Sequence, residues 1–579
     1  MKLVLKQAGK YGKDAFITMG LTAGEVLLEI LMPFITAIII DDGLQASDLS
    51  VVVRYGILMV AMAIISLGFG ALAGRFAAKS STGFAANLRE AIYNNVQTFS
   101  FSNIDKFSVP GLVTRMTTDI TNVQWAYMMC TRMAVRAPLN LIFSFVMCLI
   151  ICPHIAPTFA IAAVFLVAVL GSIMVVTIRI FNKMFDGYDD LNASVQENVS
   201  AIRVVKAFVR EGYEDKKFSK ASTRLYKLAV KAESLLAFNN PAMMLSVYFC
   251  IIMVSWMGAE LIVGGSLTTG DLTSLFSYIM SLLMSLMMLS MLVVMITMSL
   301  ASVRRISEVL REKPDLHDPD DPIYEVPNGS IDFDNVNFSY KHGSGKNALS
   351  DVDLHIRSGE TIGVIGGTGA GKSSLVNLIC RLYDVDSGDV KVGGIDVRQY
   401  DMEALRNQVA VVLQKNTLFT GTILENLRWG NENATLEECK AACQAACADE
   451  FIDRFPDGYH TRIERGGNNV SGGQKQRLCI ARALLKKPKV LILDDSTSAV
   501  DTATDARIRA AFRQTIPGTT KIIIAQRISS VQDADRILVL DDGRIDAFDT
   551  HENLLKSNAI YQDIYESQIK GGGDFDQPA

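Results

Sequence analysis

The protein has 579 residues, of which 49% are hydrophobic and only 20% are charged, and its formal net charge is −5. This length exceeds that of an ordinary single domain, so we expect at least two domains. The composition excludes a disordered chain, a collagen-like fibre and a small disulfide scaffold. The negative charge argues against a nucleic-acid-binding protein that acts through bulk positive charge, so no nucleic-acid partner is expected.

Six apolar segments within residues 1–300 are long enough to cross a bilayer, whose hydrocarbon core needs about 20 residues of helix. The 42 residues from Ala137 to Ile178 contain no Asp, Glu, Lys or Arg and count as two spans, which divide near Cys152-Pro153-His154. The other four spans are expected at Ala15–Ile40, Tyr55–Gly74, Pro241–Ala259 and Leu272–Leu300.

Basic residues are confined to alternate loops of this first half. Segments 79–131 and 179–240 are rich in Lys and Arg, whereas segments 41–50, 152–157 and 260–270 contain neither. Basic loops stay in the cytoplasm, so we expect a multi-pass protein of the cell (plasma or inner) membrane with both termini inside. The long basic segments lack the composition of linkers and are predicted to be helices that continue far below the membrane.

Two features of the spans have more than one interpretation. Glu25 and Glu29 lie four residues apart, on one face of the first span. Intramembrane carboxylates are costly and often functional, so they could meet a cationic substrate, pair with a cation on another helix, or lie near the membrane edge. The last span carries a methionine-rich face, which suits either an adaptable substrate surface or ordinary helix packing; its members are Met280, Met284, Met287, Met288, Met291, Met295 and Met298.

Residues 301–328 are rich in proline and are predicted to be a linker, followed by an α/β nucleotide-binding domain at 329–570 and a flexible tail at 571–579. An apolar strand, Glu360–Gly366, runs directly into the pattern G-x-x-x-x-G-K-S, and a helical segment follows. Glycines let backbone N–H groups turn toward phosphate oxygens, while a lysine and a serine serve the β/γ-phosphates and Mg²⁺. The predicted ATP-binding residues here are Gly366, Gly367, Thr368, Gly369, Ala370, Gly371, Lys372, Ser373 and Ser374.

A second apolar strand, Val490–Leu493, ends in Asp494-Asp495. A carboxylate at the carboxyl end of a buried strand is where a P-loop ATPase holds Mg²⁺, so Asp494 is a predicted metal-site residue together with Ser373. Three cysteines, Cys439, Cys443 and Cys447, recur at helical spacing between the two strands. No histidine accompanies them, so they are interpreted as cytosolic thiols on one helix rather than a metal site.

The segment Ser471-Gly-Gly-Gln474 lies between the P-loop and Asp494. With it, the chain resembles the ATP-binding cassette (ABC) transporters over about residues 10–570, specifically half-size exporters with six spans and one cassette. The resemblance implies a membrane α-helical type I exporter fold joined to an α/β P-loop domain. It also implies ATP and Mg²⁺ as cofactors, the bilayer as surroundings, and an amphipathic small molecule, lipid or peptide as substrate.

The resemblance assigns further roles residue by residue. Tyr340 matches the aromatic residue that stacks on adenine, and Gln414 matches the glutamine that meets Mg²⁺ and the attacking water. Asp501 matches the loop that links the two ATP sites, together with Ser498. Gly111–Asp119 and Asn192–Phe208 resemble the two intracellular coupling regions. The signature residues face the γ-phosphate held by the other cassette; they are Ser471, Gly472, Gly473 and Gln474.

Two positions depart from the family pattern. Asp495 stands where the family has the glutamate that positions or deprotonates the hydrolytic water, and Gln526 stands where it has the switch histidine. An aspartate carboxylate falls about 1 Å short, and a misplacement of that size can cost ~100-fold in rate. Glutamine can donate a hydrogen bond but cannot become cationic or carry a proton.

Both departures weaken hydrolysis at the same nucleotide. We therefore interpret the chain as the degenerate-site subunit of a heterodimeric exporter, which lends its signature to a competent site on a second half-exporter subunit. A homodimeric exporter with slow hydrolysis, and an ATP-gated channel or regulatory subunit of the same fold, are the alternatives. Six charge-depleted spans exclude a soluble ATPase, and the fusion of spans and cassette in one chain disfavours an importer.

Overall fold

The computed structural model describes residues 1–340, 347–495 and 500–571, and the chain divides into two compact units. Unit 1 consists of Met1–Thr98 and Phe107–Glu312. Unit 2 consists of Phe99–Lys106 and the chain from Lys313 onwards. The tail predicted at 571–579 lies outside the described residues except for Gly571, which ends the last helix.

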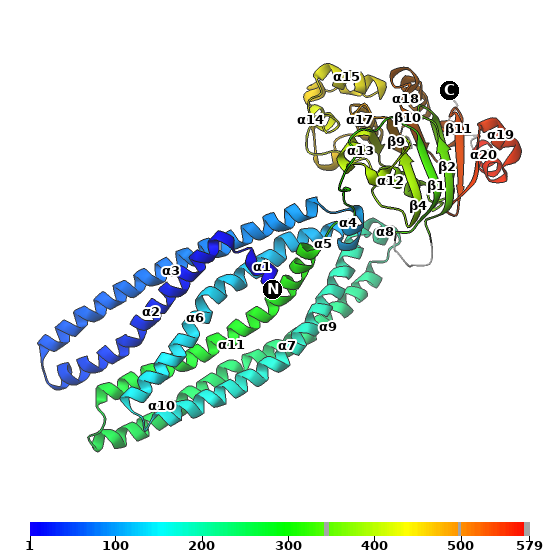
Figure 1. The fold of residues 1–579 in the computed structure, drawn as a ribbon. Helices are drawn as coiled ribbons and strands as arrows, with labels where there is room; N and C mark the ends of the chain where they lie inside the picture. Colours follow the sequence, from blue (N-terminus) through cyan, green and yellow to red (C-terminus); the bar gives the residue numbers. More distant parts are fainter. Residues whose placement is uncertain (341–346, 496–499, 572–579) are drawn as a thin grey trace. The chain divides into compact units, whose positions relative to one another are not determined.

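Unit 1 is a bundle of long helices (Figure 1). Its long members are α2 (Gly12–Ile38), α3 (Leu49–Gln97), α6 (Ile120–Ile151), α7 (Ala156–Ser200), α9 (Glu211–Ala237), α10 (Asn239–Val263) and α11 (Thr269–Arg311). Short helices are α1 (Lys2–Lys6), α5 (Val109–Thr114) and α8 (Ile202–Ala207), and π-helical turns occupy Ile39–Gln45 and Arg115–Asp119. Among the described residues, six helical segments are long and apolar enough to cross a membrane, which confirms the six predicted spans.

The helices extend well beyond the length that a bilayer requires. Helix α3 has 49 residues, which makes it ~74 Å long, more than twice the ~30 Å hydrocarbon core. The predicted helical extensions are therefore present. Helix α11 also continues to Arg311, so the first part of the segment predicted as a linker, 301–328, is helical.

The core of unit 1 is formed by apolar side chains of α2, α6, α7, α10 and α11. Pro33 lies inside α2 and cannot donate a backbone hydrogen bond there. In this stretch of α2, side chains of α11 bind backbone carbonyls: Tyr278 donates to Ile30 O at 2.7 Å and Ser274 to Pro33 O at 2.6 Å. These bonds fix α11 against the proline-containing stretch of α2.

The structure provides a partner for Glu25 and Glu29 within the bundle. Both carboxylates pair with Arg136 of α6, at 3.1 Å and 2.6 Å respectively. The predicted pairing of these carboxylates with a cation on another helix is therefore present.

Unit 2 contains two main β-sheets. The larger sheet has the strand order β12-β11-β3-β10-β9-β6, all parallel except β12. Its strands are β3 (Thr361–Gly366), β6 (Val409–Val412), β9 (Val490–Asp494), β10 (Thr520–Ile524), β11 (Arg536–Asp541) and β12 (Arg544–Asp549). The smaller, antiparallel sheet has the order β2-β1-β4-β5, with β1 (Ile331–Phe338), β2 (Leu349–Ile356), β4 (Ser387–Val392) and β5 (Ile395–Asp396). The short strands β7 (Gly421–Thr422) and β8 (Arg462–Ile463) pair separately.

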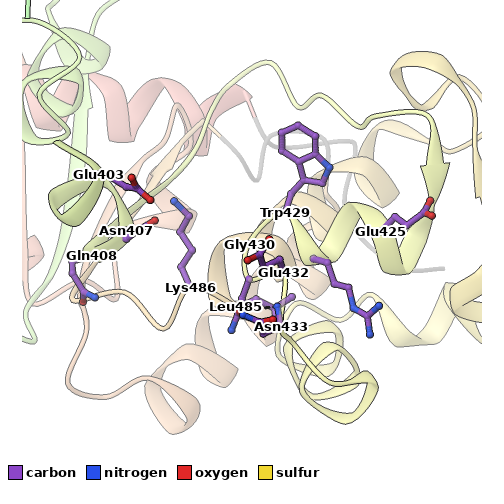
Figure 2. A pocket seen from close by; sticks show the side chains of 12 residues that line it. Glu403, Asn407, Gln408, Glu425, Trp429, Gly430, Glu432, Asn433, Leu485 and Lys486 are labelled. Atoms are coloured by element: carbon purple, nitrogen blue, oxygen red, sulfur yellow. Dashed lines mark hydrogen bonds between the residues drawn. The ribbon is translucent and has the colours of Figure 1, made fainter. Parts of the chain in front are cut away.

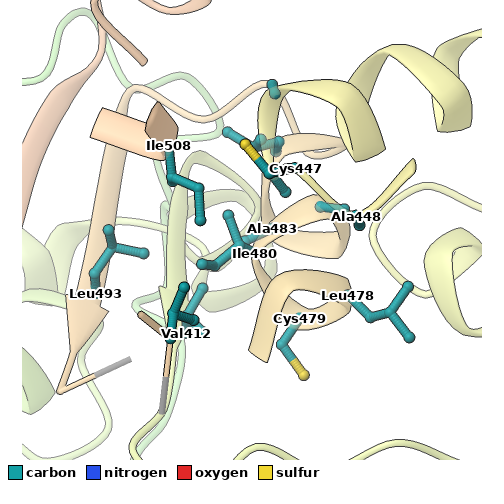
Figure 3. Packing of buried hydrophobic residues seen from close by; sticks show 14 of the residues in the cluster. Val412, Cys447, Ala448, Leu478, Cys479, Ile480, Ala483, Leu493 and Ile508 are labelled. Atoms are coloured by element: carbon teal, nitrogen blue, oxygen red, sulfur yellow. The ribbon is translucent and has the colours of Figure 1, made fainter. Parts of the chain in front are cut away.

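The central strands of the larger sheet are buried along their whole length, as their continuous apolar sequences require when both faces are covered. Helices α12 (Lys372–Ile379), α13 (Met402–Gln408), α17 (Gly472–Leu484) and α18 (Thr502–Thr515) pack against this sheet. Helices α14 (Ile423–Arg428) and α15 (Leu436–Ala445) pack on α17, and α16 (Asp449–Ile452) packs on α15. Helices α19 (His551–Ser557) and α20 (Ala559–Gly571) follow β12. Figure 3 shows side chains of α17 packed toward Val412 and Leu493. This packing holds the carboxyl ends of β3 and β9, where the predicted nucleotide residues lie.

The three cysteines at helical spacing, Cys439, Cys443 and Cys447, belong to this buried core. Burial raises the pKa of the Cys443 thiol to about 12. It therefore packs as a protonated, weakly polar side chain.

Candidate functional site

The predicted phosphate loop connects the carboxyl end of β3 to the first residue of α12, as the sequence predicted. Three of its glycines have positive φ angles: Gly366 (155°), Gly369 (85°) and Gly371 (96°). A Cβ atom at Gly366 would lie 2.2 Å from Leu540 O, so no other residue fits there without a shift of the backbone. The loop is thus both left-handed and closely packed, which aims its backbone N–H groups inward.

Lys372 lies against this loop. Its Nζ donates to Gly366 O at 2.8 Å and to Gly367 O at 2.7 Å. Burial lowers the pKa of this lysine, and the charges of Asp494 and Asp495 oppose that shift. A cation held at the mouth of a glycine-rich loop is suited to the β/γ-phosphates of a nucleotide.

Ser373 and Asp494 come together at the end of β9. The Ser373 hydroxyl donates to Asp494 Oδ1 at 3.3 Å. Burial raises the pKa of the Asp494 carboxyl, and the neighbouring Asp495 adds to this shift. A cation beside Asp494 would favour its charged form.

The donor set fits Mg²⁺. A serine hydroxyl, a buried carboxylate and the side-chain amide oxygen of Gln414 are the oxygen ligands that this ion prefers. Among the described residues, no group of three or more His, Cys, Asp or Glu side chains could hold a metal by itself. Magnesium in nucleotide sites is usually held by few protein groups together with phosphates and water, so this sparse set suits it.

Two of the predicted catalytic residues, Gln526 and Gln414, converge on the carboxylate of the third, Asp495. Gln526 donates its Nε2 to Asp495 Oδ2 at 2.8 Å, and Gln414 donates its Nε2 to the same oxygen at 3.3 Å. The backbone N–H of Asp495 donates to Ile524 O at 3.0 Å, which ties the end of β9 to β10. The carboxylate oxygen thus accepts from two neutral amides that come from different segments of the cassette.

The predicted adenine residue, Tyr340, keeps 49% of its surface exposed. Its hydroxyl lies 3.1 Å from the Ser374 hydroxyl, which links it to the first turn of α12. Phe338 meets the ring edge-on at 4.9 Å, and so does Tyr383 at 5.1 Å. These contacts orient the tyrosine beside the phosphate loop.

The signature residues Ser471, Gly472, Gly473 and Gln474 form the start of α17. Ser471 Oγ accepts from the Gln474 backbone N–H at 3.3 Å, while Gln474 Oε1 accepts from the Ser471 backbone N–H at 2.9 Å. In the described part of the chain, the side chains of Ser471 and Gln474 bond only within this capping box. The signature is therefore not joined to the P-loop of its own chain.

Asp501 caps α18 and accepts from the Thr504 backbone N–H at 2.9 Å. This bond lowers the pKa of the Asp501 carboxyl. Ser498, assigned to the same loop from the sequence, lies outside the described residues.

The sequence analysis missed one contact with the cassette. The short helix α4 (Phe101–Phe107) belongs to unit 2 except for its last residue, and Tyr383 donates its hydroxyl to Asp105 of this helix at 2.7 Å. Asn103 Nδ2 donates to Lys313 O at 3.1 Å. The sequence pattern that could have indicated the start of this helix is Ser100-x-x-Asn103. In the structure, the Asn103 side chain accepts a hydrogen bond from the Ser100 backbone N–H at 3.0 Å.

The first coupling region predicted from the sequence lies later in the chain than α4. The predicted segment, Gly111–Asp119, forms part of α5 and a π-helical turn within unit 1. Helix α4 precedes it, separated from it by Ser108, whose φ is 55°. The second predicted region, Asn192–Phe208, covers the end of α7 and all of α8.

Comparison with known proteins covers nearly the whole chain. The family described as ABC transporter transmembrane region matches residues 15–287, and the family described as ABC transporter matches residues 349–498. The ABC transporter ATP-binding protein YfiB of Bacillus subtilis is 37% identical over 569 residues, which are 98% of this chain and 99% of that protein. The ATP-dependent lipid A-core flippase of Desulfotalea psychrophila is 33% identical over 410 residues, 70% of this chain and 71% of the flippase. A bacterial Atm1-family ABC exporter with ATP bound has a TM-score of 0.83 at 26% identity and covers 97% of this chain and 99% of its own.

Removal of the Lys372 ammonium tests the phosphate loop. We expect Lys372→Ala to weaken binding of a fluorescent ATP analogue by roughly 10- to 100-fold, because a charge-assisted hydrogen bond contributes about 1.5–3 kcal/mol. Lys391→Ala is the matched control, since that lysine pairs with Asp334 on the smaller sheet. Equal affinity in the two variants would show that Lys372 does not contact the phosphates.

Loss of the Tyr383 hydroxyl tests the attachment of α4. Tyr383→Phe keeps the ring contacts but leaves Asp105 without this donor, so we expect amide hydrogen exchange in residues 101–107 of the full-length chain to accelerate about tenfold. Tyr324→Phe serves as the control, because Tyr324 is exposed. Unchanged exchange in the Tyr383 variant would mean that other contacts hold α4.

Proposed function

The chain belongs to the ABC transporter family, as a half-size exporter with one membrane unit and one ATP-binding cassette, and on this premise we propose that it is the degenerate-site subunit of a heterodimeric exporter. In this proposal its own site binds ATP and retains it. A second half-exporter subunit supplies the site that hydrolyses ATP at each cycle.

The geometry around Asp495 carries the proposal. A residue that activates water needs a free carboxylate oxygen within reach of that water. Asp495 is one methylene shorter than glutamate, and its Oδ2 already accepts from Gln526 and Gln414. Neither amide can take up a proton, so no group in this trio substitutes for the missing glutamate and histidine.

The intact parts of the cassette explain why such a chain would be retained. The phosphate loop, Ser373 and Asp494 keep the groups that bind a nucleotide and Mg²⁺. Mg²⁺, when bound, offsets the charge of the phosphates. The signature presents the start of α17. Its capping box uses the backbone N–H groups of Ser471 and Gln474, so those of Gly472 and Gly473 are the ones available to the γ-phosphate on a partner cassette. The proposed partner has Glu and His at the two altered positions.

A groove in unit 2 suits a helix from the partner. It has a volume of about 850 Å³, and Figure 2 shows Glu403 and Asn407 on one side, Trp429 on the other and Lys486 between them. Trp429 stacks on Phe419 with ring centroids 4.0 Å apart, yet 62% of its surface is exposed. Three carboxylates line the groove: Glu403, Glu425 and Glu432.

Helix α8 has the complementary character. It carries Arg203 and Lys206, exposes Ile202 and Val204, and is followed by the exposed Phe208. We propose that α8 docks in the partner's cassette and that the partner's equivalent helix docks in the groove beside Trp429. An exposed aromatic anchor with charges of opposite sign is typical of such contacts.

For the transport step, we propose that two ATP molecules clamp the paired cassettes and that the coupling helices convert this closure into alternating access of the spans. The nucleotide shifts this equilibrium only by its different affinity for the two states. The proposed orientation has both termini and the cassette in the cytoplasm, in agreement with the basic inner segments.

The proposed substrate is amphipathic and leaves the cytoplasm or the inner leaflet. Several methionines of α11, including Met284 and Met291, are exposed within the single chain, and thioethers adapt to varied apolar shapes. A cavity of about 230 Å³ beside Met298 is lined by apolar residues of α7 and α11 and by Arg304. The similarity to a lipid A-core flippase supports a lipid as one such substrate.

Restoring the two family residues tests the degenerate site. We expect the purified chain alone to hydrolyse ATP slowly and the double variant Asp495→Glu/Gln526→His to be faster by roughly 10- to 100-fold, because the carboxylate regains about 1 Å of reach. Steady-state phosphate release in nanodiscs measures this difference. Asp495→Asn/Gln526→His is the matched control and should stay slow. Rapid hydrolysis by the unaltered chain would contradict the proposal and favour an active homodimer.

A further inference from the structure

The membrane unit contains a cluster of three charged side chains whose charges do not balance. Arg136 of α6 donates from Nη1 to Glu25 Oε1 at 3.1 Å and from Nη2 to both oxygens of Glu29 at 2.6 and 2.8 Å. Two carboxylates therefore share one guanidinium. In the described part of the chain, neither glutamate has another ion-pair partner.

The cluster lies on two helical segments that are long and apolar enough to cross the membrane. Glu25 and Glu29 are near the middle of the segment Gly9–Gln45, and Arg136 lies in the interior of the segment Val109–Ile151. Uncompensated charges within a membrane span are costly, so intramembrane charges pair with one another or with a ligand. One negative charge remains here after the pairing.

Two atoms of the cluster, Glu25 Oε2 and Arg136 Nε, are buried without a hydrogen-bond partner among the described residues. Glu25 itself is 8% exposed. Gly70 of α3 faces this carboxylate, and a Cβ atom there would lie 3.0 Å from Glu25 Oε1. The glycine thus lets the α3 backbone approach the carboxylate more closely than a side chain would permit.

The cluster is accessible from one side. The Glu29 side chain is 33% exposed and the Arg136 side chain 27%, whereas that of Glu25 is only 11% exposed. A ligand can therefore approach along Glu29 toward the buried oxygen of Glu25.

We propose that the Glu25–Arg136–Glu29 cluster binds the positively charged head of an amphipathic substrate. The surplus carboxylate supplies the countercharge, and Arg136 keeps the two carboxylates close together until the ligand arrives. This inference deepens the exporter function proposed above and rests on it for the passage of the bound cation across the membrane.

Arg132 is the residue that could reverse this preference. It lies one helical turn from Arg136 on α6 and makes no ion pair in the residues that the structure describes. If its charge controlled the site, an anion would bind in place of a cation. A pair of probes with the same shape and opposite charges separates these two cases.

The experiment compares tetraphenylphosphonium with tetraphenylborate on the full-length chain in nanodiscs, with empty nanodiscs as the baseline. We expect saturable binding of the phosphonium ion and none of the borate ion. Glu29→Gln should weaken phosphonium binding about tenfold or more, since it removes a full charge in a low-dielectric site. Glu260→Gln should leave the affinity unchanged, because that glutamate bonds to Trp256 elsewhere on α10.

A fourth variant separates binding from a purely structural role. Arg136→Gln removes the cation but keeps both carboxylates, so phosphonium binding should persist, and thermal melting checks that each variant is folded. Loss of binding in both Glu29→Gln and Arg136→Gln, equal binding of the two probes, or no phosphonium binding by the unaltered chain would overturn the cation site. The assay needs neither ATP turnover nor a partner chain, so an exporter that fails to transport would leave its result intact.

Discussion

The hydrogen bonds to the Asp495 carboxylate determine what the cassette can do. Gln414 follows β6 and Gln526 follows β10, and both side chains reach the one oxygen that follows β9. The strand order brings these three ends to the same edge of the larger sheet. The two amides hold the carboxylate in position but cannot exchange protons near neutral pH. In the role proposed for this chain, nucleotide binding and hydrolysis are thereby separated.

That separation gives a role to the segments that lie apart from the P-loop. The signature is a complete capping box whose bonds are local, and α8 presents exposed apolar and basic residues. Both are surfaces to which a second chain would be complementary. Asp105 of helix α4 accepts a hydrogen bond from the Tyr383 hydroxyl, and the Tyr383 ring meets the ring of Tyr340 edge-on. Helix α4 is thereby connected to the residue predicted to stack on adenine.

The spans, the phosphate loop and the end of β9 were predictable because each depends on local sequence: an apolar run of sufficient length, or a strand followed by glycines and a helix. The partner of Glu25 and Glu29 was not, because the register between α2 and α6 depends on the packing of the whole bundle. The hydrogen bonds from Gln526 and Gln414 to Asp495 could not be predicted from the sequence, because they too depend on how distant segments pack together. The association of α4 with unit 2 was not predicted, since this short helix carries too few residues for helical periodicity to stand out.

The most direct test of the degenerate site is the fate of the γ-phosphate on this chain. The purified chain is incubated with Mg²⁺ and an azido-ATP labelled at either the α- or the γ-phosphate, freed of unbound nucleotide and photocrosslinked. The account predicts that both labels remain on the chain in equal amounts after several minutes, because Tyr340 and Lys372 hold ATP that Asp495 does not help to hydrolyse. Retention of the α-label with loss of the γ-label would contradict it, since it would mean that this chain hydrolyses its own nucleotide.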